Sequence, residues 1–221
     1  MKKTKKYAKH AFTLAEVLIT LVIIGVIAAL TVPALIQNTQ KQEYVSALKK
    51  TYSTLSQVTQ QIIAEEGSPK GESGWINLDI DEIYKLFKKH LNISKDCRDT
   101  SCRTYSVQYL GGGTSSFKGR LILNDGVLFS ISDKFPNCNY MKNDTWINAG
   151  SDYVCGFIRV DVNGEKGPNI HGRDLFMFVI KENGLYPAGC DDVNVCADGV
   201  RAGNFGWGCT CKVLREGAMN Y

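Results

Sequence analysis

The sequence predicts an α+β fold in which one long N-terminal helix packs on an antiparallel β-sheet head. An apolar stretch over 12–36 continues into an amphipathic stretch over 37–66, as a single long helix requires. Short alternating runs with tight turns follow residue 94, which is typical of antiparallel strands. All eight cysteines lie after residue 96, so we expect disulfides to hold the head together.

The first element is an apolar helix over 12–36. It contains one charge, Glu16, and the 20 residues from Val17 to Ile36 carry no ionisable side chain. At ~1.5 Å per residue, that length matches the ~30 Å hydrocarbon thickness of a bilayer. Residues 1–11 include five lysines and no acid, and such a basic flank stays in the cytoplasm. We expect one membrane span, with everything after Ile36 outside the cytoplasm.

Glu16 is unusual for a membrane helix. A lone carboxylate costs roughly 2.5–3.5 kcal/mol at mid-bilayer and therefore needs a cation as partner. The surrounding pattern is a basic leader, a small residue, then Phe-Thr-Leu-Ala-Glu and a long apolar run. This pattern resembles the class III signal of type IV prepilins and type II secretion pseudopilins, and it is a specific signature.

The resemblance implies how the chain is processed. A prepilin peptidase would cut between Ala11 and Phe12 and methylate the new amine of Phe12. Glu16 would pair with the N-terminal amine of a neighbouring subunit, as a register device, because losing one partner of a buried ion pair is costly. The implied partners are this peptidase, other pilin-like subunits and an inner-membrane assembly platform. Ala11 is a departure, since the family usually has Gly there.

The resemblance also implies a structural function. The chain would be a subunit of a type IV pilus, type II secretion or competence-type filament, at the cell surface or in the periplasm. The alternative is a plain signal anchor, which would make the chain a monomeric, single-pass binding protein with an extracytoplasmic head. A second alternative is a secretory signal cut near Ala34. Glu16 argues against it, because a secretory signal should carry no charge in its apolar core.

The helix is expected to continue to Glu66. Pro33 removes one helical hydrogen bond and should bend the helix rather than end it, although two helices hinged there would give the same architecture. Past Gln37, apolar residues recur every three or four positions, at Val45, Leu48, Tyr52, Leu55, Val58 or Thr59, and Ile62. The predicted parts are a leader (1–11), a membrane helix (12–36), its amphipathic continuation (37–66) and a head (67–221).

The head should begin with a helix over 79–91 that Asp79 can cap. Strands are predicted over 104–110, 117–123, 127–131, 157–162, 175–180 and 185–187. Asn124-Asp125-Gly126 is typical of a hairpin turn. No helix is expected between these strands, so the sheet should be antiparallel, with its apolar face on the amphipathic helix.

Eight cysteines lie in the part placed outside the membrane: Cys97, Cys102, Cys138, Cys155, Cys190, Cys196, Cys209 and Cys211. Cys97 and Cys102 are close enough in sequence to bond to each other. A bond between Cys138 and Cys155 would close the loop over 133–153. The last four cannot be paired from sequence. Cys209 and Cys211 would face the same way in a strand, where Cys190 and Cys196 could form disulfides with them. Zinc is the alternative, but C-x-x-C spacing is absent.

One late loop carries several oxygen ligands, at Asp161, Asn163, Glu165 and Asp174. Alternating oxygens around a Gly resemble the start of a calcium loop, and the major pseudopilins carry a calcium site in a comparable loop. The alternative is plain turn chemistry at Asn163-Gly164, since Gly172 stands where an EF-hand has its last acid. Apart from calcium, no cofactor is expected.

No enzyme function is expected. The histidines are His10, His90 and His171, of which His90 should be an exposed helix residue, and no G-x-S-x-G, H-E-x-x-H or P-loop is present. The formal charge of +4 falls to −1 once the five leader lysines are removed. The mature chain therefore has no net positive charge that would indicate nucleic-acid binding.

Overall fold

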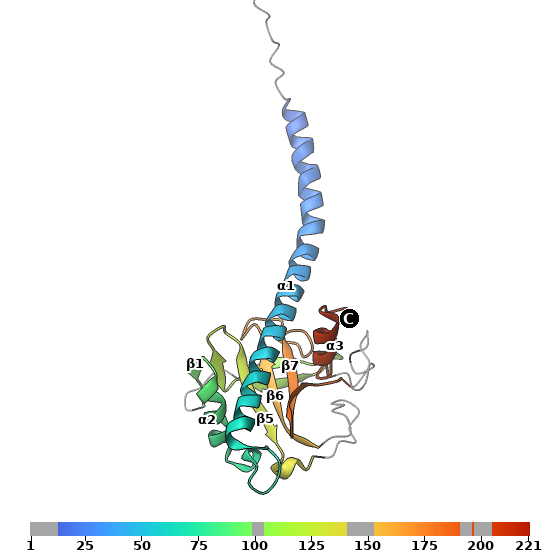
Figure 1. The fold of residues 1–221 in the computed structure, drawn as a ribbon. Coiled ribbons are helices and arrows are strands. Elements are labelled where there is room, and N and C mark those ends of the chain that lie inside the picture. The colour runs from blue at the N-terminus through green and yellow to red at the C-terminus, as the bar shows by residue number, and fades with distance from the viewer. Residues whose placement is uncertain (1–12, 99–103, 141–152, 191–195, 197–204) are drawn as a thin grey trace, which may run out of the picture. The chain divides into compact units, whose positions relative to one another are not determined.

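The computed structural model describes residues 13–98, 104–140, 153–190, 196 and 205–221. The chain divides into two compact units, Met1–Gln40 and Lys41–Tyr221. Helix α1 (Leu14–Glu66) begins in the first unit and ends in the second (Figure 1). It confirms the predicted long N-terminal helix, which continues past Pro33 as one helix.

The second unit contains the sheet. Among the described residues, six strands form one antiparallel sheet in the order β1-β4-β5-β6-β7-β8, while β2 and β3 form a separate hairpin. The strands are β1 (Ile93–Asp96), β2 (Thr104–Gln108), β3 (Thr114–Lys118), β4 (Leu121–Leu123), β5 (Leu128–Lys134), β6 (Val154–Asp161), β7 (Leu175–Lys181) and β8 (Gly184–Pro187). The shorter helices are α2 (Ile80–His90) and α3 (Cys209–Glu216), with 3-10 turns at Trp75–Asn77 and Pro136–Cys138.

The part of α1 that belongs to the second unit covers one face of this sheet, as its apolar stripe predicts (Figure 1). The ring of Tyr52 stacks on Phe178 of β7 with 5.6 Å between ring centroids. Helix α2 packs into the same core, where Phe87 lies 5.3 Å from the ring of Phe129. The stripe is buried at Val45, Leu48, Thr51, Leu55, Val58, Thr59 and Ile62.

The two faces of the central strands separate two apolar clusters. On β6, Ile158 and Val160 face the core that contains α1. Phe157 belongs to a smaller cluster with Met177 and Val179 of β7. Because side chains alternate along a strand, this second cluster lies on the opposite face of the sheet.

The strand predicted over 117–123 is wrong as a single element. Phe117 lies in β3 and pairs with Tyr105 of β2, whereas Leu121 lies in β4 and pairs with Phe129 of β5. The break falls at Gly119, where a Cβ atom would meet Leu128 at 2.8 Å. The hairpin turn after β4 forms as predicted, with Gly126 at φ 87°.

The helices of the head differ from the prediction at two points. Asp79 occupies the N-cap position of α2, but its side chain forms no capping hydrogen bond. Helix α3 was not predicted, and it ends at Gly217 in the left-handed conformation with φ 65°, a common helix C-terminal signal.

Candidate functional site

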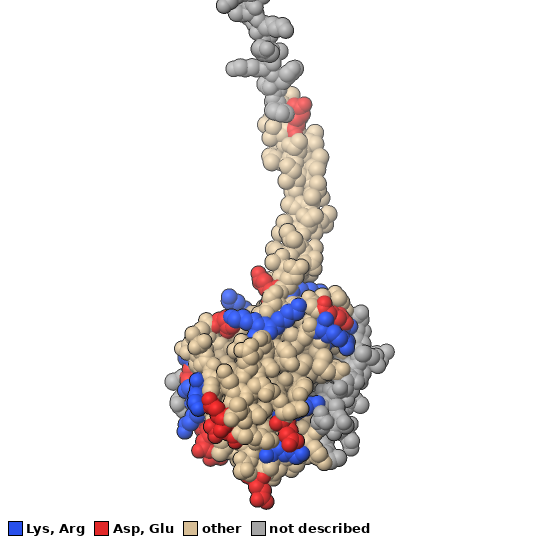
Figure 2. All heavy atoms as spheres, in the orientation of Figure 1, with Lys and Arg blue, Asp and Glu red and all other residues tan. Residues whose placement is uncertain are grey.

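The first candidate site is the part of α1 in the first unit. Its large apolar side chains are exposed; Leu14 is 78% exposed and Leu30 is 74% exposed. Helix α1 contains a stretch long and apolar enough to cross a membrane, and Figure 2 shows uncharged side chains along almost all of this segment. So much exposed apolar surface marks a membrane or protein interaction site, so this segment requires lipid or partner protein around it.

Glu16 lies in the first turn of α1 and forms a capping box with Thr13. The Thr13 N–H and hydroxyl donate to Glu16 Oε2 at 2.8 and 2.9 Å, while the Glu16 N–H donates to Thr13 Oγ1 at 3.2 Å. These reciprocal bonds satisfy groups that a helix start leaves without partners. Both Thr13 bonds use one carboxylate oxygen, so Oε1 stays available to a cation. The T-x-x-E spacing is the sequence signal from which this capping box could have been predicted.

The other predicted residues of this segment are only partly described. Ala11 and Phe12, the predicted cleavage and methylation site, lie outside the described residues. Pro33 lies inside α1, on the same helix as Glu16. Cleavage, methylation and a bend at Pro33 therefore stay predictions.

The head contains disulfides, as predicted. The described pairs are Cys138–Cys155, Cys190–Cys211 and Cys196–Cys209. Cys97 is also disulfide-bonded, and its predicted partner Cys102 lies outside the described residues. No described cysteine is free. Thiols held in disulfides cannot bind zinc as thiolates, so the zinc alternative is wrong for these residues.

The placement of Cys209 and Cys211 on a strand is wrong. Both lie in the first turn of α3, where a spacing of two residues turns side chains by about 200° around the helix axis. They therefore reach different partners. The two resulting bonds anchor the start of α3 to Cys196 and Cys190.

The loop after β6 contains two buried carboxylates, Asp161 and Asp174. Asp161 accepts hydrogen bonds from the Tyr105 hydroxyl at 2.5 Å and the Asn163 N–H at 3.2 Å. Asp174 accepts two backbone N–H bonds, both at 2.7 Å. Burial raises the pKa of Asp161 to about 8 and also raises the pKa of Asp174. Negative charge is therefore costly in this loop unless a cation accompanies it.

Amide oxygens complete this oxygen cluster. Oδ1 of Asn163 and Oδ1 of Asn169 are buried without a hydrogen-bond donor. Glu165 is exposed, and no group of three or more His, Cys, Asp or Glu suited to a metal is found among the described residues. The arrangement thus offers two carboxylates and two amide oxygens, which are the hard donors that calcium prefers.

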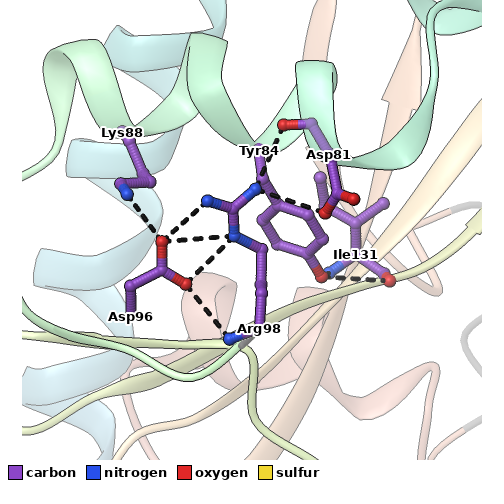
Figure 3. A network of polar contacts seen from close by, with 6 residues as sticks. All are labelled: Asp81, Tyr84, Lys88, Asp96, Arg98 and Ile131. Carbon is purple, nitrogen blue, oxygen red and sulfur yellow. Dashed lines mark hydrogen bonds and ion pairs between the residues drawn. The ribbon is translucent and has the colours of Figure 1, made fainter. Parts of the chain in front are cut away.

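A polar network between α2 and β1 was not foreseen from the sequence (Figure 3). Asp96 accepts hydrogen bonds from Arg98 at 2.7 to 3.2 Å and from Lys88 Nζ at 2.6 Å. Arg98 also reaches the carboxylate of Asp81 at 3.3 Å. These hydrogen bonds, first those from Arg98, hold the pKa of Asp96 well below its usual range. The acid is therefore charged in the folded head and ties α2 to β1.

The same network is continued by Tyr84 of α2 (Figure 3). The Arg98 guanidinium lies 5.6 Å from the Tyr84 ring, and the Tyr84 hydroxyl accepts a 2.8 Å hydrogen bond from the N–H of Ile131. A buried tyrosine hydroxyl usually needs such a partner. The contact fixes α2 against β5.

The prediction that His90 is an exposed helix residue is wrong. Its side chain is 13% exposed, and its Nε2 lies 3.1 Å from Glu65 Oε2. Lys89 Nζ lies 2.6 Å from the same oxygen. These contacts join α2 to the end of α1, so His90 has a structural role.

Comparison with known proteins identifies the N-terminal segment. Residues 6–32 match the family model described as the prokaryotic N-terminal methylation motif. The matched range contains both Thr13 and Glu16 and ends just before Pro33. No curated protein and no solved structure matches the chain.

Proposed function

Since the chain carries the signature of type IV prepilins and pseudopilins over residues 6–32, we propose that it is a structural subunit of a filament. A prepilin peptidase processes it, and it joins other pilin-like subunits in a type IV pilus, type II secretion or competence-type machine. The observation that carries the proposal is the first-unit part of α1, which exposes apolar side chains behind one acid, Glu16. Helices of this kind associate in a bilayer through close packing.

The proposed topology places residues 1–11 in the cytoplasm and the head outside. The five leader lysines support this orientation. The disulfides of the head support it too, because such bonds persist in oxidising compartments. The subunit would wait in the inner membrane, where the assembly platform receives it.

Glu16 is assigned the pairing role in assembly. Thr13 holds one carboxylate oxygen, which fixes the side chain at the helix start. The free oxygen would accept the N-terminal amine of a neighbouring subunit, so that neither charge is left alone in an apolar surrounding.

The proposal is tested by intact mass and N-terminal sequencing of the protein from cells with and without a prepilin peptidase. We expect peptidase-dependent loss of residues 1–11 and a methyl group on Phe12. The competing function is a monomeric, membrane-anchored binding protein. A leader that stays attached in both strains would contradict the filament proposal and favour this anchor.

We also propose that the loop over 161–174 binds calcium in the mature protein. The buried Asp161 and Asp174 and the unpaired amide oxygen of Asn163 support this. Calcium should raise the melting temperature more than magnesium, because magnesium demands tighter geometry. Asp174→Asn should abolish the rise, whereas Glu165→Gln, at the exposed acid of the same loop, should retain it. Equal melting temperatures with and without calcium would count against the site.

A further inference from the structure

A cavity of about 450 Å³ lies on the sheet face opposite α1. Its floor includes Phe157 and Arg159 of β6 and Met177 of β7. Alternation along β6 turns these side chains away from Ile158, which faces the core with α1. The volume is in the range of small-molecule pockets. None of the residues that line the cavity belongs to the assembly segment or to the loop over 161–174.

Aromatic side chains make up half of the residues that line the cavity. Phe135 stacks on Tyr140 with 4.3 Å between ring centroids and meets Phe157 edge-on at 5.3 Å. On the other side, Tyr109 meets Trp207 edge-on at 5.9 Å. Flat apolar walls of this kind accept the face of a ring.

Arg159 places a positive charge in this aromatic cavity. Its Nε is buried without a hydrogen-bond partner, and no ion pair to it is found among the described residues. Its guanidinium lies 5.6 Å from the Phe117 ring. Burial lowers the pKa of Arg159. By contrast, Arg98 of the same head is held by two carboxylates, those of Asp96 and Asp81.

The neighbouring groups do not neutralise this charge. Asp133 lines the cavity but is exposed on β5, so water screens it. His171 is buried beside Tyr109, with 5.4 Å between ring centroids, and an imidazole offers no negative charge. A buried cation without a hydrogen-bonded anion is costly.

We propose that this cavity binds a carboxylate carried on a six-membered ring with an apolar face, with the carboxylate against Arg159 and the ring between the aromatic side chains. An arginine fork matches a carboxylate with two parallel hydrogen bonds. Two sources present this chemistry: an aromatic carboxylic acid, and a uronic acid unit of an acidic polysaccharide. The site does not depend on the proposed filament function, because it lies entirely within the second unit.

The test is ligand binding to the full mature chain in detergent, by calorimetry or saturation-transfer NMR. The probes are 4-hydroxyphenylacetate and galacturonate, each beside its neutral counterpart, tyrosol and galactose. We expect one acid to bind at least about tenfold more tightly than its counterpart, and which acid binds identifies the source. Equal affinity for acid and counterpart, or no binding of either acid at millimolar concentration, would overturn the proposal.

Two pairs of variants test the charge of Arg159 and the volume of the cavity separately. Arg159→Gln should reduce the affinity of the acid to that of its neutral counterpart, whereas Arg215→Gln, at an exposed arginine of α3, should not change it. Ser115→Trp fills the cavity from the hairpin and should abolish binding. Its matched control is Ser116→Trp, at an exposed neighbouring position. Unchanged binding in both Arg159→Gln and Ser115→Trp would place the ligand elsewhere.

Discussion

Two polar side chains of the head, Asp96 and His171, differ in whether they have a hydrogen-bond partner. Asp96 is charged and held by Arg98 and Lys88. His171 has no hydrogen-bond partner for its buried Nε2, and the positive charge of Arg159 adds to the cost of protonating it. The first group stabilises the fold as an ion, and the second only as a neutral ring.

His171 should lower the stability of the head at acidic pH, whereas Asp161, whose pKa burial raises to about 8, should have the opposite effect. The pKa of His171 falls from 6.5 to about 3 on folding, so below pH 6.5 the unfolded chain takes up a proton that the folded chain refuses. The contribution of His171 to stability is therefore present above pH 6.5 and is lost as pH falls, by up to about 1.4 kcal/mol per pH unit. His171→Phe keeps a ring beside Tyr109 and removes this contribution, so the variant should lose less stability between pH 7 and pH 4.5 than the unaltered protein does. Chemical denaturation of both proteins at the two pH values measures the difference, from which the contribution of Asp161 cancels.

The pH range of the stability loss distinguishes His171 from Asp96. The pKa of Asp96 is lowered from 3.8, so its contribution is present above that value and is lost only at lower pH. Asp96→Asn is therefore the control, and its pH dependence between 7 and 4.5 should equal that of the unaltered protein. If His171→Phe shows the same dependence as well, the histidine is not the acid-sensitive group.

At the scale of elements, the spacing of apolar residues predicted the helix and the strands that depend on local sequence alone. The stripe that buries Leu48 and Leu55 and the main strands β5 to β7 follow from spacing alone. The break at Gly119 could not be predicted, because it depends on Leu128 in another strand. Helix α3 was missed for a similar reason, since disulfides from residues distant in sequence fix its short first turn.

Disulfides should stabilise α3 more than its own length does. An isolated helix of eight residues is marginal in water. Replacing Cys190 and Cys211 together by Ser opens a loop with a sequence separation of 21, which should cost about 3 kcal/mol and lower the melting temperature by roughly 6–12 °C. Calorimetry measures the shift, and hydrogen exchange should show faster exchange of α3 amides than of β6 amides.

The control for this variant is the second disulfide of α3, Cys196–Cys209. Replacing Cys196 and Cys209 by Ser opens a shorter loop, with a separation of 13, so its cost should be slightly smaller. A double variant at Cys190 and Cys211 that melts like the unaltered protein would show that α3 is held by packing alone.

At the scale of the whole molecule, the two units carry different kinds of information. The methylation motif of the first unit was predictable, because its signal is local: one acid, a basic flank and an apolar run. The cavity around Arg159 was not predictable, because it joins side chains from elements far apart in sequence. The network around Asp96 joins α2 and β1, which are neighbours in sequence, but it depends on how this helix and this strand pack together. The proposed filament function thus rests on the first unit, and the proposed ligand on the second.

Assembly should depend on the charge of Glu16 rather than on its capping bond. Gln also serves in a capping box, so Glu16→Gln keeps the helix start but removes the charge. Thr13→Ala removes the cap, at about 1 kcal/mol, but keeps the charge. We expect both variants to insert and to lose the leader, yet only Glu16→Gln to be absent from filaments sheared from cells overproducing the protein. Intact mass and the subunit content of the sheared fraction measure this; normal assembly of Glu16→Gln with failure of Thr13→Ala would assign Glu16 to capping instead.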